Sequence, residues 1–316
     1  MHMHEPRKGL GRFLAAVTVV ALALGACSGA GSGSKGTVNI AVNPWVGYES
    51  DAAVVAYLLD KELGYKVVKK DLKEEVSWQG FESGEVDVVL ENWGHPELVK
   101  TYITDKKVAL DAGQTGNKGI IGWYVPQWMA DKYPDILDWN NLNKYADLFK
   151  TSESGDKGQL LDGDPSYVTN DEALVTNLKL NYKVVQGGSE AALIKSLQQA
   201  TDQKTPLLFY FYEPQWILAK VKIAHVKLPP YTDGCDADPK KVACDYPPYD
   251  LNKVVSKKFA DSGGKAYEFV KNFNWTNDDQ NTVSEMIANQ GMKPEDAAKT
   301  WVDAHQDVWK KWIPAG

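Results

Sequence analysis

The chain has 316 residues, of which 43% are hydrophobic, 24% charged and 11% aromatic. This composition is typical of a globular protein with one large core or two ordinary ones, and it excludes disorder, collagen and repeat solenoids. Lys and Arg total 35 against 42 Asp and Glu, and no long basic block is present, so nucleic acid is not expected as a partner. Eleven tryptophans are more than packing requires, which suggests that some of them bind a ligand.

The N-terminal residues have the pattern of an export signal. Three basic residues precede an apolar run over 13–24, which is shorter than the roughly 20 residues that span a membrane. The sequence Leu24-Gly-Ala-Cys27 resembles the lipobox of bacterial lipoproteins, where cleavage leaves the cysteine N-terminal and lipidated. We therefore expect a signal peptide over 1–26, a lipid on Cys27, a flexible tether over 27–36 and a protein anchored outside the cytoplasm. A plain secretory signal with a chance cysteine is the alternative.

Strands and helices alternate along the next part of the chain. Strands are predicted over Thr37–Val42, Tyr65–Lys69, Val86–Leu90, Lys118–Pro126 and Leu207–Tyr212. Helices are predicted over Asp51–Leu63, Ser77–Ser83, Tyr133–Phe149 with an interruption at Pro134, Asp171–Leu180 and Ser189–Ala200, and Gly155–Pro165 is predicted to be turns. This alternation indicates an α/β fold with parallel strand pairs.

Cys235 and Cys244 are the cysteines that remain if Cys27 is lipidated. They lie in a polar loop that contains Pro and Gly, so an oxidising compartment favours a disulfide between them. A zinc site is the alternative, but the nearest histidine, His225, is ten residues before Cys235.

The clearest helical pattern begins at Pro294, near the end of the chain. Apolar residues then recur at three- and four-residue spacing from Ala298 to Trp312. A single helix is predicted here, with its tryptophans and His305 packed in the core.

No sequence motif of an enzyme is present. Gly-x-Ser-x-Gly, His-Glu-x-x-His, Gly-x-x-x-x-Gly-Lys-Ser/Thr and a helix-opening Gly-x-Gly-x-x-Gly are all missing, and no two of His95, His225 and His305 have metal-ligand spacing. We therefore expect no catalysis, no cofactor and no metal. His95 follows Trp93-Gly94, and two roles stay open for it: a general base or hydrogen-bond donor at the site, or a loop histidine bonded to backbone.

Aromatic residues follow several of the predicted strands, where ligands of open α/β sheets bind. They are Trp45 after the first strand, Trp93 after the third, Trp123 in the fourth and Tyr212 at the end of the last. If these rings converge, they form a cage that suits a methylated ammonium group, which donates no hydrogen bonds and gains about 0.5 to 2 kcal/mol per ring.

These residues resemble the substrate-binding proteins of ABC transporters for glycine betaine, choline and related quaternary amines. The resemblance rests on Trp45 in a strand-to-helix loop, Glu91-Asn-Trp93 followed by Pro96, the strand Gly119–Pro126 and Tyr212-Glu-Pro-Gln-Trp216. It extends from about residue 37 to residue 230. It implies a two-lobed type II periplasmic-binding-protein-like fold with a hinge, and delivery of the ligand to a permease driven by an ATPase. Lobe I would comprise 37–122 and 222–316, and lobe II would comprise 123–221.

The resemblance also implies roles for single residues. Trp45 and Trp93 match the family's cage tryptophans of the first lobe, Tyr212 matches a third cage aromatic, and Trp123 is a candidate fourth wall. Tyr167, in Asp164-Pro-Ser-Tyr167, is expected to add a polar contact from lobe II.

Two positions depart from the family pattern. Gly47 stands where choline-specific relatives carry an acidic residue, so backbone N–H groups at Gly47, Tyr48 and Glu49 are expected to bind a carboxylate. Gln215 stands where many relatives have histidine. The first departure favours glycine betaine or another zwitterion.

The sequence thus predicts a lipid-anchored binding protein that captures glycine betaine or a related methylated amine and hands it to an ABC importer. One alternative is the same fold with another solute, such as a choline-like cation or an amino acid. Glu91 or Glu213 turned inward would favour the bare cation, whereas both turned outward would favour a zwitterion. A cell-envelope enzyme that uses His95 and a structural lipoprotein without a closed cleft are further alternatives.

Overall fold

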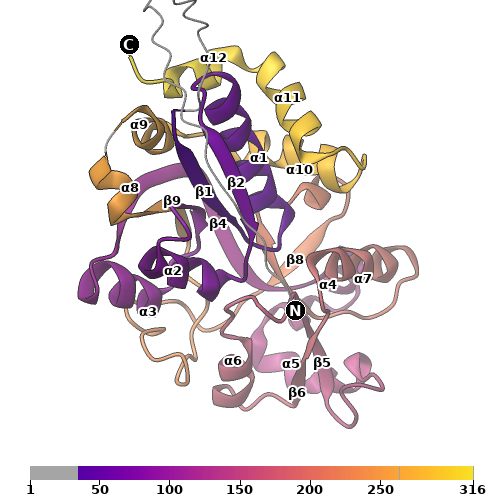
Figure 1. Ribbon diagram of the computed structural model, residues 1–316. Coiled ribbons are helices and arrows are strands. Elements are labelled where there is room, and N and C mark those ends of the chain that lie inside the picture. The colour runs from indigo at the N-terminus through magenta and orange to yellow at the C-terminus, as the bar shows by residue number, and fades with distance from the viewer. Residues whose placement is uncertain (1–34, 263, 316) are drawn as a thin grey trace, which may run out of the picture. The chain divides into compact units, whose positions relative to one another are not determined.

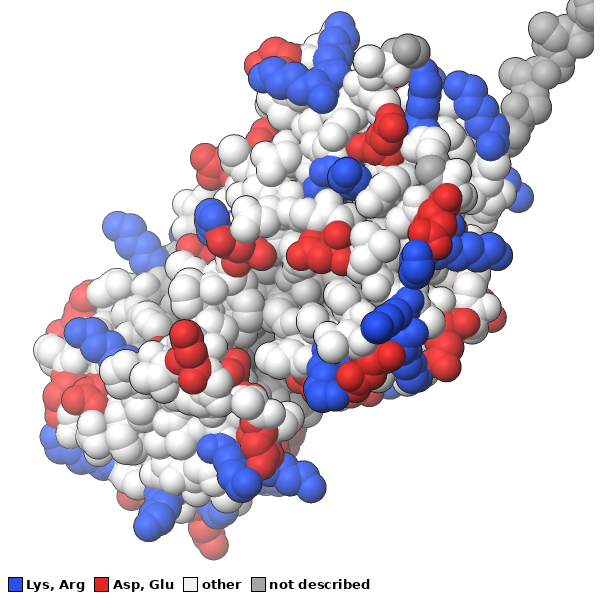
Figure 2. All heavy atoms as spheres, turned by 90° about the vertical axis from the view of Figure 1, so that its left-hand side faces the viewer, with Lys and Arg blue, Asp and Glu red and all other residues white. Residues whose placement is uncertain are grey.

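The computed structural model describes residues 35–262 and 264–315, which belong to one compact unit (Figure 1). The predicted signal peptide, the lipidation of Cys27 and the tether up to residue 34 lie outside the described residues. Within them, no helix combines the length and the apolar character that crossing a membrane requires. On the face that Figure 2 shows, acidic and basic side chains are interspersed and form no extended basic patch.

A mixed sheet of nine strands organises the described residues, in the order β2-β1-β3-β9-β4-β7-β5-β6, with β8 paired to β4. The strands are β1 (Thr37–Val42), β2 (Lys66–Asp71), β3 (Val88–Asn92), β4 (Ala109–Pro126), β5 (Gly158–Asp162), β6 (Tyr182–Gln186), β7 (Phe209–Glu213), β8 (Ile223–Val226) and β9 (Tyr249–Ser256). Parallel pairs join β1 to β2 and β3, and join β5 to β6 and β7. All pairs made by β4 and β9 are antiparallel.

Strand β4 divides the sheet into two halves. Its residues up to Gly119 pair with β9, and its residues from Ile120 onward pair with β7 and β8. We call β1, β2, β3, β9 and the first part of β4 the first half-sheet, and the other strands with the rest of β4 the second half-sheet. The chain passes between them twice in the described residues: within β4, and in the segment 227–248 that links β8 to β9.

Helices cover both half-sheets. They are α1 (Val46–Lys61), α2 (Glu74–Ser83), α3 (Pro96–Leu98), α4 (Gln127–Lys132), α5 (Leu142–Tyr145), α6 (Asp171–Asn177), α7 (Glu190–Asp202), α8 (Lys257–Ser262), α9 (Lys265–Asn272), α10 (Asn277–Ala288), α11 (Pro294–Ala304) and α12 (Gln306–Trp309). Helix α1 packs against α10 and α11, so helices near the C-terminus cover the first helix of the described residues (Figure 1). A capping box at Thr276 and Asp279 sets the start of α10.

Most predicted elements are present, and the predicted α/β class is confirmed. The turns predicted over Gly155–Pro165 are wrong in part, because the buried Leu160 and Leu161 form β5 there. The single C-terminal helix is also wrong: α11 ends before His305, which has φ −121° and ψ 42°. The His305 ring stacks on Trp301 at 4.7 Å and its Nδ1 hydrogen-bonds to the Trp301 carbonyl, which stabilises this break. The tryptophans of this region are buried, as predicted.

Candidate ligand-binding site

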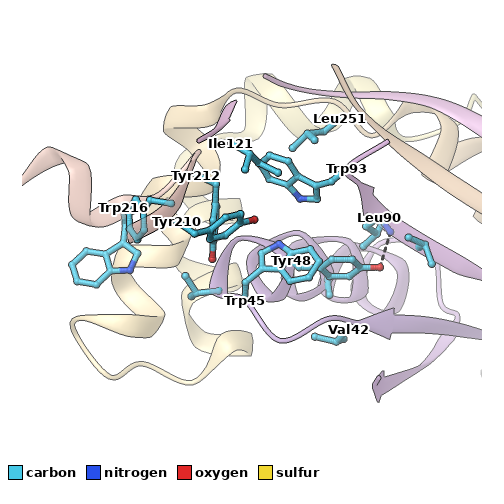
Figure 3. Close-up of a cluster of buried hydrophobic side chains, with 14 of the residues drawn as sticks. Val42, Trp45, Tyr48, Leu90, Trp93, Ile121, Tyr210, Tyr212, Trp216 and Leu251 are labelled. Carbon is cyan, nitrogen blue, oxygen red and sulfur yellow. Dashed lines mark hydrogen bonds between the residues drawn. The ribbon is translucent and has the colours of Figure 1, made fainter. Parts of the chain in front are cut away.

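A cavity of about 290 Å³ lies where the loops after β1 and β3 face the loop after β5 and one face of β7. Six aromatic residues that line it are called the cage below: Trp45, Trp93, Tyr167, Tyr210, Tyr212 and Tyr249. Neighbouring rings of the cage touch, with centroids 5.6 Å apart for Trp45 and Tyr167, and 5.9 Å apart for Trp93 and Tyr212. Both half-sheets therefore contribute rings to one enclosure (Figure 3).

Trp45 is placed by the turn between β1 and α1. Its backbone is extended, with φ −140° and ψ 149°, and it precedes the first residue of the helix. The preceding Asn43 fixes the turn, since its amide donates to the Leu72 carbonyl and to the Ser77 hydroxyl. The Trp45 ring meets Tyr48 edge to face at 5.4 Å, and Tyr48 is fully buried beneath it.

Trp93 follows β3 and lies against bare backbone of β4. A Cβ on Gly119 would come within 2.5 Å of the Trp93 ring, so only glycine leaves room for the indole there. The other side of the ring meets Tyr249, the first residue of β9, at 5.6 Å.

Glu91 does not line the cavity, but it accepts hydrogen bonds from both cage tryptophans. Its Oε1 accepts the indole N–H of Trp45 at 3.0 Å and that of Trp93 at 2.8 Å. Its Oε2 accepts from the amide of Gln280 on α10 at 2.8 Å. The indoles are thus locked to one oxygen atom, and their faces rather than their N–H groups are left for a ligand.

A second buried acid, Asp51 on α1, lies next to Glu91. Burial raises the pKa of Asp51 well above its usual value, and the neighbouring charge of Glu91 raises it further. Burial also raises the pKa of Glu91, but the groups that donate to Glu91 oppose that shift. The pair therefore favours a proton on Asp51 and the negative charge on Glu91.

Asp51→Asn is expected to flatten the dependence of stability on pH. The native pKa of Asp51 is raised above its ordinary value of 3.8, so the native state binds more protons than the unfolded state between these two values. The contribution of Asp51 is fully present below about pH 4 and is lost as the pH rises through the native pKa. Urea unfolding between about pH 4 and 8 measures the slope, with exposed Asp60→Asn as the control. Equal slopes in wild type and Asp51→Asn would contradict this prediction.

The second half-sheet brings tyrosines up to the tryptophans. Tyr167, from the loop after β5, donates its hydroxyl to the Pro44 carbonyl at 3.2 Å and so reaches across to the Trp45 turn. Tyr210 and Tyr212 alternate along β7, which places both on one face of the strand. Tyr212 donates its hydroxyl to the buried Glu190 at 2.5 Å.

His95 forms a buried pair with Glu74 at one edge of the cavity. Its Nε2 lies 2.5 Å from Glu74 Oε1. Burial alone would lower the pKa of the imidazole, but the Glu74 carboxylate outweighs this effect and raises it. The other Glu74 oxygen accepts a long hydrogen bond, 3.4 Å, from the backbone N–H of Val168. Glu74 thus joins His95 to the loop after β5, and the bond of His95 is to a carboxylate rather than to backbone.

The disulfide loop forms another wall. Cys235 and Cys244 are joined by a disulfide bond, and Tyr231, Asp236 and Tyr246 from the loop and its flanks line the cavity. The Tyr246 hydroxyl donates to Asp171 at 2.7 Å and accepts from the backbone N–H of Asn170 at 2.8 Å. This segment is therefore fastened to the start of α6. No cluster of potential metal ligands occurs among the described residues.

The structure brings four of the seven predicted ligand-binding residues to the cavity: Trp45, Trp93, Tyr167 and Tyr212. Gly47 and Tyr48 lie in the first turn of α1 and do not line it. Trp123 is fully buried, and its indole donates to Asp171 at 2.8 Å within the second half-sheet. Sequence reasoning named His95 as a candidate at the site but missed its partner Glu74, and it also missed Tyr210 and Tyr249. The two-residue spacing of Tyr210 from Tyr212 was the signal for Tyr210, and no sequence signal pointed to Glu74.

Comparison with known proteins matches residues 36–304 to the family model described as the substrate binding domain of ABC-type glycine betaine transport systems. The chain belongs to this family.

Members of this family deliver their ligand to ABC permease and ATPase subunits. Among similar sequences, the trimethylamine N-oxide-binding protein of Pelagibacter ubique (strain HTCC1062) is 24% identical over 289 residues, which is 87% of this chain and 90% of that protein.

Two solved structures share the fold. One is lactococcal OpuAC in its closed-liganded conformation with glycine betaine, with a TM-score of 0.70 and 23% identity over 88% of this chain and 99% of that one. The other is an ABC-transporter choline binding protein in complex with choline, with a TM-score of 0.71 and 18% identity over 87% and 91% of the two chains. These similarities confirm the predicted type II periplasmic-binding-protein fold.

Proposed function

We propose that this protein captures a small quaternary or polymethylated amine between the rings of its cage and hands it to an ABC importer. The observation that carries the proposal is the convergence of six aromatic rings from both half-sheets on one cavity. Among the described residues that line this cavity there is no Lys or Arg. A methylated ammonium group cannot donate hydrogen bonds, and ring faces are its best partners.

The size of the cage is sufficient for useful affinity. Each ring in van der Waals contact with the cation contributes about 0.5 to 2 kcal/mol. Four contacting rings would supply about 2 to 8 kcal/mol before the entropy cost of association, which allows dissociation constants down to about micromolar. The relatives support the same ligand class, since they include proteins named for trimethylamine N-oxide and one solved with glycine betaine.

The two half-sheets correspond in this proposal to the two lobes that close on the ligand. Sequence analysis put the lobe boundaries after residue 122 and after residue 221. Strand pairing changes partner at Gly119 and Ile120, and the return passage lies within 227–248. We propose that hinge motion is centred on these two passages.

Attachment to the membrane through a lipid on Cys27 completes the proposed function. Anchoring would keep the binding protein near its permease, outside the cytoplasm. Metabolic labelling of the full chain with a radioactive fatty acid, compared with Cys27→Ala, tests this part separately; equal labelling of both chains would contradict it.

Two kinds of ligand are compatible with this proposal: glycine betaine, which the sequence predicts, and a choline-like cation. Neither Glu91 nor Glu213 lines the cavity, so the criterion based on those residues does not favour the bare cation. Three other acidic residues do line it: Glu74, Glu97 and Asp236. This acidic lining favours a ligand with net positive charge.

A thermal-shift screen tests the proposal. We expect at least one of choline, glycine betaine, carnitine, proline betaine and trimethylamine N-oxide to raise the melting temperature, because a ligand that binds only the native state stabilises it. Ethanolamine and glycine are matched controls that lack the methyl groups, and they should give no shift at the same concentration. If no methylated compound shifts the transition, or the controls shift it equally, the proposed ligand class is wrong.

A further inference from the structure

The start of α1 is already bonded to a carboxylate of the protein. This helix begins directly after Trp45, and its first backbone N–H, that of Val46, donates to Glu190 Oε2 at 2.8 Å. Glu190 is the first residue of α7, 144 positions along the chain, so the bond joins the two halves of the molecule. The N-terminus of a helix is an anion-binding site, and here a carboxylate of the protein itself occupies that site.

Burial raises the pKa of the Glu190 carboxyl, but the hydrogen bonds that it accepts oppose this shift and favour its charged form. Its second oxygen accepts from the Tyr212 hydroxyl at 2.5 Å and from the Gln215 amide at 2.7 Å. All three of its partners are therefore donors, and Glu190 is only 8% exposed. Donors converging on both oxygens favour the charged form over the acid.

A ligand carboxylate has no place beside this group. A second anion at the start of α1 would face Glu190 in a site shielded from water, where like charges repel strongly. The backbone N–H of Val168, which lines the cavity, donates to the Glu74 carboxylate. Protein carboxylates thus occupy both of these backbone donors.

Resting on the proposed function, we infer that Glu190 is the specificity-determining residue that excludes a ligand carboxylate. The site then takes a methylated ammonium group whose other end is neutral, such as a hydroxyl or an alkyl group, in preference to a zwitterion. Gln215 and Tyr212 act with Glu190 by holding its carboxylate against α1.

Calorimetric titration of choline, tetramethylammonium and glycine betaine into the full chain tests this inference. For the wild type we expect choline to bind at least about tenfold more tightly than glycine betaine. Glu190→Gln removes the charge but keeps the size, and Glu190→Ser also opens space at the start of α1. Each should raise the affinity for glycine betaine relative to choline by about tenfold or more.

Glu172→Gln is the matched control, because it removes the same charge from an exposed carboxylate in the first turn of α6 that does not line the cavity. We expect it to leave the ratio of the two affinities within about twofold, since solvent screens exposed charges. Tight binding of glycine betaine to the wild type, or an unchanged ratio in both Glu190 variants, overturns the role of Glu190 and leaves the methylated-amine proposal intact. Failure of all three compounds to bind the wild type would count against the proposed function itself.

Discussion

Trp45→Ala and Trp93→Ala are each expected to weaken ligand binding by about 1 to 3 kcal/mol, which is a loss of roughly ten- to a hundredfold in affinity. Each truncation removes one ring face from the cation and opens the cavity to water. Both residues are 7% exposed, and the same Glu91 oxygen holds both indoles in place, so neither ring is free to replace the other. Calorimetric titration with the compound that gives the largest thermal shift measures the loss.

Trp139→Ala provides the control for these variants. Trp139 is half-buried, lies in a short 3-10 turn of the second half and does not line the cavity. Its truncation removes the same indole ring and should leave the affinity unchanged. If both cage variants bind the ligand with wild-type affinity, the ligand does not lie between these rings.

Glu91→Ala is expected to weaken binding about as much as the loss of one cage ring, although Glu91 does not line the cavity. The substitution leaves the indole N–H groups of Trp45 and Trp93 without their acceptor, so both rings lose their fixed orientation. Each buried unpaired donor costs about 1 to 3 kcal/mol, so for the two indoles we expect the free energy of unfolding to fall by about 2 to 6 kcal/mol. Ligand titration and urea unfolding measure the two effects.

Glu91→Gln separates orientation from charge. The amide oxygen can still accept from both indoles, so affinity should return to within about tenfold of the wild type. A Gln variant as weak as the Ala variant would show that the negative charge behind the rings is what binding needs. Unchanged binding in Glu91→Ala would mean that Glu91 does not position the rings.

Much of the cage follows from the order of elements in the sequence. Trp45 lies three residues after the end of β1, and Trp93 directly follows β3. The two strands are parallel neighbours, so the residues that follow them lie at the same edge of the sheet. Tyr212 lies on a strand whose alternating pattern is evident in the sequence. Such local patterns are sufficient to predict which rings meet when the strands that carry them are neighbours.

Residues that depend on long-range pairing could not be predicted in this way. Tyr249 reaches Trp93 because β9 inserts between β3 and β4, far from either in sequence. Glu190 meets Val46 only after both half-sheets have formed. The contacts expected from Gly47 and Tyr48 stay a prediction; α1 starts at Val46, five residues before the predicted helix, and this earlier start turns Tyr48 into the core.

The position of Trp93 links the cage to the passages between the half-sheets. Gly119 and Tyr249 are paired across β4 and β9, and they mark the two points where the chain changes half. The Trp93 ring touches both: it lies against the Gly119 backbone and meets the Tyr249 ring. Because Pro247 and Pro248 fix φ just before Tyr249, little rotation is available on that side. If the two halves move as proposed, the axis of closure would lie beside this indole, so that one side chain would both contact the ligand and adjoin the hinge.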